Sequence, residues 1–118
     1  MAIQRQDGWA NDSAVGDVDL TGKERRFVIR TSTGIRLTQN SEQIAGVLQE
    51  GKAAGLRSSF ATGGHPIKVV ASQAFTVGQA VQAGADGTAI VGTTNQCGVA
   101  RNACASGELL EVMFDRIT

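Results

Sequence analysis

The chain has few of the side chains from which large cores and aromatic binding sites are built. Among its 118 residues Tyr is absent, and only four Phe and one Trp occur. Aromatic side chains bury the most apolar area per residue, so the core must rest on Val, Ile, Leu and Ala. Scarce aromatics also argue against a platform on which single-stranded nucleic acid would stack. A chain of this length predicts one domain with a modest core.

Neither sign of charge is in excess, because eleven Lys and Arg residues balance eleven Asp and Glu residues. Nucleic-acid-binding proteins usually carry a basic excess, since neutralised phosphates supply much of their affinity. No apolar run approaches the roughly 20 residues that span a bilayer, and the first thirty residues hold no signal-peptide core. We therefore expect a cytosolic protein that binds neither nucleic acid nor membranes.

Residues that would assemble a catalytic or metal site are also few. His65, in the turn-like Gly63-Gly64-His65-Pro66, is the single histidine that a His-based triad would need. Cys97 and Cys104 with one distant His fall short of four zinc ligands, so both cysteines are expected to be small buried residues. Neither a phosphate-binding loop nor a dinucleotide fingerprint occurs. The sequence predicts no enzyme, no metal and no cofactor.

Short apolar runs separated by turn residues fill the chain from Arg26 onward. Two pairs of runs flank turns in the manner of β-hairpins, namely 27–30 with 35–38 and 80–82 with 88–91. Further strands are predicted at 66–71 and 109–114. Residues 41–50 fit either a helix capped by Asn40 or a strand, and Gly46 in the middle favours a strand at 44–49.

The two hairpins indicate an internal repeat. Val28, Gly34 and Leu37 recur with identical spacing as Val81, Gly87 and Ile90, and Ala45-Gly46-Val47 recurs as Cys97-Gly98-Val99. The runs 67–70 and 110–113 would close the two halves, if residues 50–60 are an insertion in the first half. The pattern predicts an all-β fold, a small antiparallel barrel or sandwich with a pseudo-twofold repeat.

Residues 1–22 are polar and follow neither the strand nor the helix period, so we expect an extended N-terminal arm before a single β domain at 23–118. Trp9 in this arm would either anchor the chain in a pocket of a partner or fold back on its own domain. Charged and exposed-looking residues in the arm, in the basic cluster at 23–26 and in the loop at 50–60 are the candidate partner contacts. These candidates are Trp9, Lys23, Arg25, Arg26, Lys52, Leu56 and Arg57.

Residues 69–114 carry a family resemblance. Val77-Gly78-Gln79-Ala80-Val81, Ala85-Asp86-Gly87, Cys97-Gly98-Val99-Ala100 and the run from Ala105 to Val112 follow one another in a familiar order. This arrangement resembles the decoration (cement) proteins of tailed-phage capsids, small β proteins that are sometimes labelled recombinase-related. The first hairpin matches the family only loosely, and the longer polar start departs from it.

The resemblance implies a structural virion protein, made in the bacterial host cytoplasm, that binds the outer surface of the assembled major capsid protein. It also implies a homo-oligomer, with a trimer favoured, and no catalytic or cofactor residues. Such a protein would stabilise the phage head by mass action, because it binds only the assembled lattice.

Two other classes of function stay open on the residues alone. A small-ligand or glycan-binding β-module, such as an adhesin or a tail-associated domain, would bind sugars without any capsid. A regulatory β-domain of an enzyme complex would depend on His65, Cys97 or Cys104.

Overall fold

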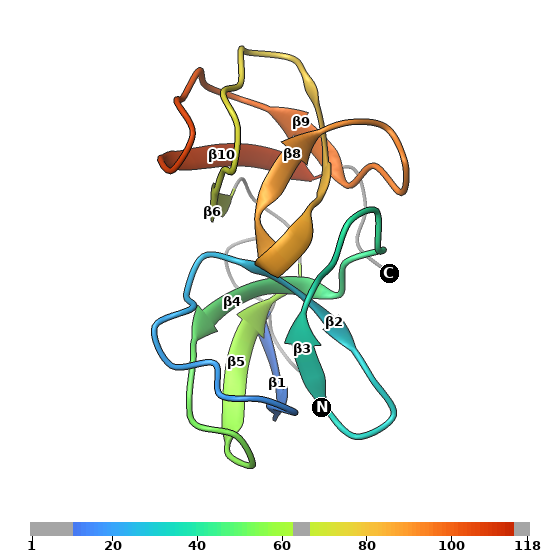
Figure 1. Cartoon of the computed structure of the whole chain (residues 1–118), viewed down its shortest axis with the longest axis vertical. Helices are drawn as coiled ribbons and strands as arrows, with labels where there is room; N and C mark the ends of the chain where they lie inside the picture. The colour runs from blue at the N-terminus through green and yellow to red at the C-terminus, as the bar shows by residue number, and fades with distance from the viewer. Residues whose placement is uncertain (1–10, 63–66, 115–118) are drawn as a thin grey trace.

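The computed structural model describes residues 11–62 and 67–114, which form two antiparallel five-stranded sheets (Figure 1). The first sheet has the order β1-β5-β4-β2-β3 and the second the order β6-β10-β9-β7-β8. The strands are β1 (Asn11–Val15), β2 (Phe27–Arg30), β3 (Ile35–Leu37), β4 (Gly46–Glu50), β5 (Arg57–Ala61), β6 (Ile67–Val70), β7 (Ala80–Ala83), β8 (Ala89–Val91), β9 (Gly98–Ala100) and β10 (Leu109–Phe114). A 3₁₀ turn, η1 (Ala85–Gly87), joins β7 to β8. The predicted all-β class is confirmed.

The internal repeat is also confirmed, because the second sheet repeats the strand order of the first with every strand five places later in the chain. We call residues 11–62 the first half and residues 67–114 the second half. Val28 lies opposite Gly46, and Val81 lies opposite Gly98, as the sequence match requires. Leu37 corresponds to Val91 rather than to Ile90, because the second hairpin turn is one residue longer.

The insertion expected at 50–60 is wrong. Residues 57–61 form β5, which pairs with both β1 and β4 and closes the first half. Residues 67–70 form β6, which opens the second half and pairs with β10. The equivalent of β10 is therefore β5. Its sequence, Arg-Ser-Ser-Phe-Ala, shows little apolar alternation, which is why its role is hard to see before the pairing is known.

Gly46 and Gly98 explain the recurring Gly-Val pair. A Cβ atom on Gly46 would lie 2.3 Å from the carbonyl oxygen of Ala61, and one on Gly98 would lie 2.2 Å from that of Met113. Both glycines therefore let a neighbouring strand approach where no side chain fits. The strand expected at 44–49 is confirmed as β4, and the helix alternative is excluded.

Each sheet curls until its two edge strands meet in a single parallel bridge, Gly16 with Ile35 in the first half and Ala71 with Ala89 in the second. The curl of the first half encloses a cluster of buried side chains, which are Leu20, Val28, Ile35, Leu37, Ala45, Leu48 and Phe60. A larger cluster fills the second half and takes in Phe27, Ile44, Val47 and Ala61 from the first. The first sheet is thus buried on both faces, and the halves pack as a sandwich.

The two halves meet through non-equivalent surfaces. Phe27 packs edge-on against Phe114, with ring centroids 6.4 Å apart, and Arg26 donates to the carbonyl oxygen of Asp86 at 2.9 Å. The register places Ala80 where the first half has Phe27. An exact twofold axis between the halves would repeat each contact with the equivalent residues exchanged. Ala80 has no aromatic ring and cannot repeat the contact that Phe27 makes. The side-chain contact between Phe27 and Phe114 is therefore not repeated by the equivalent residues of the other half.

The arm expected over residues 1–22 needs a correction. Asn11–Val15 form β1 and pair with β5 along their full length. Leu20 is fully buried in the first-half core. Residues 11–22 therefore belong to the β fold, and deleting residues 1–20 would remove an edge strand and a core side chain. Trp9 and His65 lie outside the described residues.

Candidate functional site

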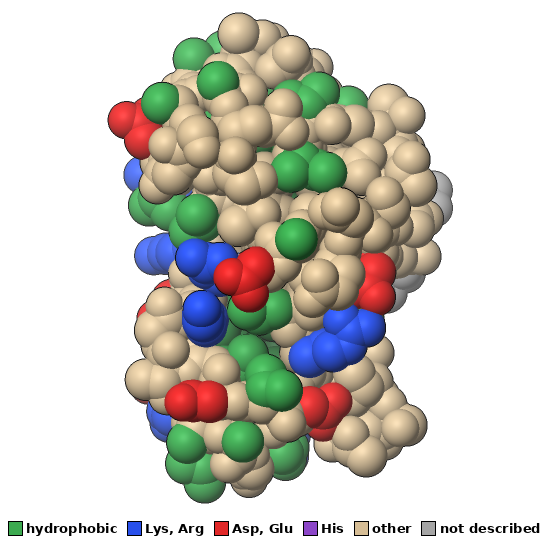
Figure 2. Space-filling model, in the orientation of Figure 1, with side chains coloured by type: hydrophobic (Ala, Val, Ile, Leu, Met, Phe, Trp, Pro, Cys, Tyr) green, Lys and Arg blue, Asp and Glu red, His purple; other side chains and the backbone are tan. Residues whose placement is uncertain are grey.

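The predicted basic residues gather where the β1–β2 loop runs back along the end of β4. The backbone N–H of Leu20 donates to the carbonyl oxygen of Lys52 at 2.9 Å, and that of Lys23 donates to Leu20 at 3.0 Å. Arg25 donates to Leu48 at 2.9 Å. The fold thus brings Lys23 and Arg25 to Lys52. Figure 2 shows Lys and Arg side chains on this flank, at the level where the halves meet.

Acidic residues are interleaved with this basic group. A carboxylate oxygen of Glu24 accepts from the backbone N–H of Gly51 at 2.8 Å, and Lys52 Nζ lies 4.0 Å from a carboxylate oxygen of Glu50. The surface is therefore mixed in sign rather than a uniform positive field. Such a pattern suits recognition of another protein's mixed surface better than attraction to a polyanion.

Arg25 has a left-handed backbone, with φ at +69°. Its counterpart in the second half is Gly78 (φ +90°), whose N–H donates to Ala100 as that of Arg25 donates to Leu48. A non-glycine residue pays about 1 kcal/mol for this conformation. Arg25 thus keeps an exposed side chain where the repeat otherwise has Gly, and its carbonyl oxygen accepts from the backbone N–H of Val70 at 2.8 Å, across the two halves.

Arg26 and Arg57 hold the fold together. Arg26 Nη1 lies 3.3 Å from a carboxylate oxygen of Asp86, across the two halves. Arg57 donates to Ser13 through Nε at 3.2 Å to the hydroxyl and through Nη2 at 2.9 Å to the carbonyl oxygen. Among the predicted basic contacts, these two side chains bind residues of the other half or of another strand, whereas Lys52 pairs with nearby Glu50.

Leu56 lies at the far end of the first half, in the β4–β5 turn, with 55% of its surface exposed. The N–H of Gly55 donates to Gly16 at 3.0 Å, and the N–H of Gly16 donates to Leu56 at 3.1 Å. Val18, two residues after Gly16, is also half exposed. We call Val18 and Leu56 the apolar tip. Figure 1 places this turn at the end remote from the second half, where Figure 2 shows apolar side chains.

The second half has a polar tip in the same place. Ala71 receives a hydrogen bond from Gly107 and donates one to Glu108, as Gly16 does with Gly55 and Leu56. Glu108 is therefore the counterpart of Leu56, and Gln73 is the counterpart of Val18. Leu56 was a candidate from its sequence, whereas Val18 was missed. In the sequence, Val18 could have been recognised as a candidate contact because it is an apolar residue between two aspartates in a polar stretch.

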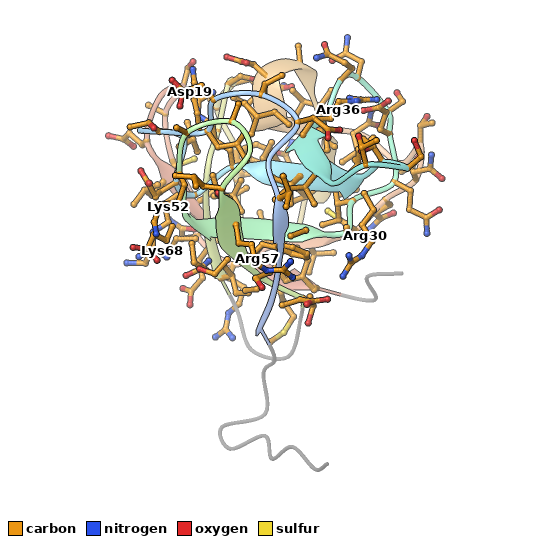
Figure 3. The ribbon with its side chains drawn as sticks, turned by 90° about the horizontal axis from the view of Figure 1, so that it is seen from below. Asp19, Arg30, Arg36, Lys52, Arg57 and Lys68 are labelled. Carbon is orange, nitrogen blue, oxygen red and sulfur yellow. The ribbon has the colours of Figure 1, made fainter. Side chains whose placement is uncertain are left out.

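Other charged side chains are spread around the molecule. Seen from below, Figure 3 shows Lys52 and Lys68 on one side of the molecule and Arg30 and Arg36 on the other. Asp19 accepts from the backbone N–H of Thr21 at 3.0 Å, and hydrogen bonds from Thr21 lower the pKa of Asp19. Asp19, Arg30 and Arg36 thus each have a partner within the chain.

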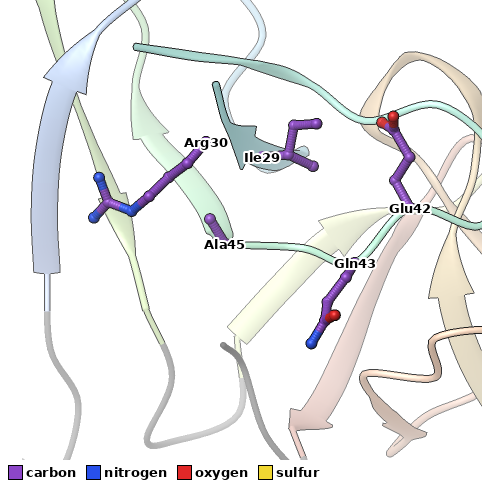
Figure 4. Close-up of a pocket in the computed structure, with 5 residues that line it drawn as sticks. All are labelled: Ile29, Arg30, Glu42, Gln43 and Ala45. Carbon is purple, nitrogen blue, oxygen red and sulfur yellow. The ribbon is translucent and has the colours of Figure 1, made fainter. Parts of the chain in front are cut away.

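A shallow hollow of about 340 Å³ lies between β2 and the segment before β4, lined by Ile29, Arg30, Glu42, Gln43 and Ala45 (Figure 4). Its charged groups are engaged in the fold. Arg30 pairs with Asp12 and lies over the ring of Phe60, 5.2 Å from its centroid. Glu42 accepts from Arg36 Nη2 at 2.9 Å, and this bond lowers the pKa of Glu42. The hollow shows no acid or base poised for proton transfer.

Metal ligands and membrane-spanning helices are not found in the described part of the chain. Over residues 11–62 and 67–114, no three His, Cys, Asp or Glu side chains come together as a metal site would require. Within the same ranges no helix has the length and apolar character to cross a bilayer. Cys97 is buried and Cys104 packs against the same core, where burial raises the pKa of the Cys104 thiol. The packing role expected for both cysteines is confirmed.

The duplicated β fold, the mixed-charge flank and the apolar tip define a protein with surfaces suited to binding other proteins. The family model of the phage cement protein matches residues 11–114, and the chain therefore belongs to the phage cement protein family. It is a structural protein of the virion, associated with the phage capsid. The family expectation from residues 69–114 is confirmed.

A solved structure has the same fold. The crystal structure of the head fiber gp8.5 N base in bacteriophage phi29 superposes with a TM-score of 0.78 at 16% sequence identity. The match covers 93% of this chain and 97% of that one. A search of the curated proteins finds no match.

Proposed function

We propose that this cement protein binds the outer surface of the assembled capsid through its apolar tip, with the major capsid protein as its partner. The supporting observation is the difference between the two tips, since Leu56 stands where the other half has Glu108. Evolution of a duplicated fold toward solubility alone would favour polar residues at both tips. Lys23, Arg25 and Lys52 lie on the flank between the tip and the second half, and they would add polar contacts that orient the docking.

The energetics of this arrangement suit a protein present in many copies. Burying the exposed part of Leu56 and of Val18 contributes on the order of 1 kcal/mol each. Mixed charges on the flank add specificity and a faster encounter more than affinity. Binding to the assembled lattice then stabilises the head by mass action at every occupied site.

A homo-oligomer would strengthen this attachment. We propose a trimer, the state that the family resemblance favours, made in the host cytoplasm before it reaches the shell. Three tips that bind neighbouring capsid subunits together would hold far more tightly than one, because later contacts form at high effective concentration. No catalytic step belongs to this function. Trp9, outside the described residues, is retained as a proposed contact.

Co-sedimentation with empty expanded capsids tests the proposal. The full chain should bind saturably, and the double variant Val18→Gln/Leu56→Glu, which copies the second-half residues onto the first-half tip, should bind at least tenfold more weakly. Glu108→Ala is the matched control at the equivalent turn and should bind like the unmodified chain. Thermal unfolding checks that all three proteins fold.

Unchanged binding by the double variant would refute the role of the apolar tip. A protein without residues 1–10, which leaves β1 intact, separately measures the contribution of Trp9. If the full chain binds no shell but binds sugars on a glycan panel, the alternative ligand- or glycan-binding module replaces the capsid proposal.

A further inference from the structure

Among residues 11–62 and 67–114, the second sheet has an outer face with exposed apolar side chains. Along β10, side chains alternate between the core and the outside, so Leu109, Glu111 and Met113 point outward together. Leu109 is 43% and Met113 is 36% exposed. Register partners across the sheet point the same way, which adds Val70, Lys68 and Val99 to the face. We call these six residues the outer face.

The same face of the first sheet is an interface. Val47 lies opposite Ala61 in the first half as Val99 lies opposite Met113 in the second. Val47 and Ala61 are fully buried, because the second half covers them. Their counterparts Val99 and Met113 have no such cover within the described residues. In this chain the part of the face that corresponds to Val99 and Met113 is thus already used once to bind a copy of the same fold.

The charges on the outer face favour another copy of this chain over a partner of one sign. Lys68 and Glu111 lie directly opposite each other on β6 and β10, flanked by the apolar pair of Val70 and Leu109. The face therefore carries both signs and no net charge. The chain as a whole is also neutral, so copies would not repel one another. An apolar surface with balanced charges is compatible with self-association.

We infer that the outer face, centred on Leu109 and Met113, is the contact between copies of this chain. The inference rests on the homo-oligomer of the proposed function and assigns it a surface. The apolar tip, at the far end of the first half, stays free for the shell (Figure 1). Two separate surfaces then serve two partners.

Light scattering after size exclusion tests the inference on the full chain. The unmodified protein should have a mass of two or more chains, and of three chains if it is the proposed trimer. Leu109→Glu/Met113→Glu should raise the dissociation constant between copies at least tenfold and shift the mass toward one chain. Both residues are exposed, so the fold should survive, as thermal unfolding would show. Met113→Leu, which conserves volume, should keep the oligomer.

Val18→Gln/Leu56→Glu is the matched control, because it changes a different exposed apolar surface and should leave the oligomer mass unchanged. An oligomer that survives Leu109→Glu/Met113→Glu overturns the inference, and so does an unmodified chain that is monomeric at every concentration. Shell binding is read separately. An oligomer that binds no capsid refutes the proposed capsid binding and leaves the inference standing. A monomer that binds capsid refutes the inference and the proposed homo-oligomer, and it leaves the proposed capsid binding standing.

Discussion

The two halves of the molecule share one scaffold and differ in what their surfaces meet. Each half has the same strand order and the same closing bridge between its edge strands. Each also has a glycine at the start of its fourth strand, Gly46 in β4 and Gly98 in β9. The first half buries Val47 and Ala61 of its outer face under the second half, and its tip is apolar. Within the described residues, the second half leaves Leu109 and Met113 of its outer face exposed, and its tip is polar. Duplication thus preserved the backbone constraints and let the surfaces diverge.

This contrast teaches that backbone geometry and surface role are set separately. Gly46 and Gly98 are retained because a Cβ atom has no room in either copy. Leu56 and Glu108 are free to differ, because each lies in an exposed turn where the backbone hydrogen bonds suffice. A repeat is therefore recognised from the positions where the backbone restricts the residue type. Positions at which the two copies carry different exposed residues indicate where their surfaces have different roles.

The largest expected effect tests the shared scaffold. Gly46→Ala should lower the free energy of unfolding by about 3 kcal/mol or more, because the new Cβ would lie 2.3 Å from the carbonyl oxygen of Ala61. Gly98→Ala should cost a similar amount for the same reason. Urea unfolding followed by circular dichroism measures both.

Gly16→Ala is the matched control, since its counterpart in the second half is Ala71. The nearest atom to a Cβ on Gly16 is the carbonyl oxygen of Val18 at 3.0 Å, so a small adjustment accommodates it. Its cost should stay under about 1 kcal/mol. If Gly46→Ala were no worse than Gly16→Ala, the close strand approach would not be the reason for the recurring glycine.

A second prediction compares one residue type at equivalent positions. Val47→Ala should cost about 2 kcal/mol, because the side chain is fully buried between the halves. Val99→Ala should cost less than about 1 kcal/mol, because the same position of the second half is only partly buried. Chemical unfolding at a concentration where the chain is monomeric gives the comparison.

Raising the protein concentration sharpens this test. If the outer face joins copies, the cost of Val99→Ala should grow with concentration, whereas that of Val47→Ala should not. Equal costs for the two substitutions at low concentration would contradict the asymmetric burial of the halves.

The smallest expected effect is on the free energy of unfolding at low pH, and it arises from two carboxyl groups of the first half. The hydrogen bond from Arg36 lowers the pKa of Glu42, and those from Thr31 and Thr33 lower the pKa of Asp17. A carboxyl whose pKa is lowered on folding stabilises the fold above its ordinary value, 4.5 for Glu42, and this stabilisation is lost as the pH falls through the folded pKa.

Glu42→Gln should therefore reduce stability slightly at pH 7, by less than about 1 kcal/mol, because the pair with Arg36 is partly exposed. The difference between the unmodified chain and the variant should narrow as the pH falls below 4.5. Urea unfolding at several pH values from 7 to about 3 measures it. A difference that is constant over this range would mean that the ion pair contributes nothing.

Much of the fold could be predicted from residues near one another in the chain. The two hairpins follow from short apolar runs around turns, and β4 follows from Gly46, which disfavours a helix. β1 was missed because Asn-Asp-Ser-Ala-Val is polar and only Ala14 packs against a core. β5 was missed because its strand character depends on two neighbours that lie far away in the sequence.

The candidate site divides in the same way. Lys23, Arg25, Lys52 and Leu56 were found because charged and loop residues are visible in the sequence, and the structure gathers the three basic ones. Arg26 and Arg57 have the same chemistry, yet each is engaged by a partner from another strand or the other half. Val18 and the outer face could not be found, since their exposure depends on what covers them.

By itself the sequence determined the all-β class, the duplication and the phage cement family, because these depend on turn residues, β-branched runs and the order of short motifs. Only the tertiary structure decided which copy is covered. Val47 and Val99 are the same residue in equivalent strands, and Val47 is buried while Val99 is partly open. The reason is that the halves meet through non-equivalent surfaces, so the second half covers Val47, whereas no described part of the chain covers Val99 in the same way.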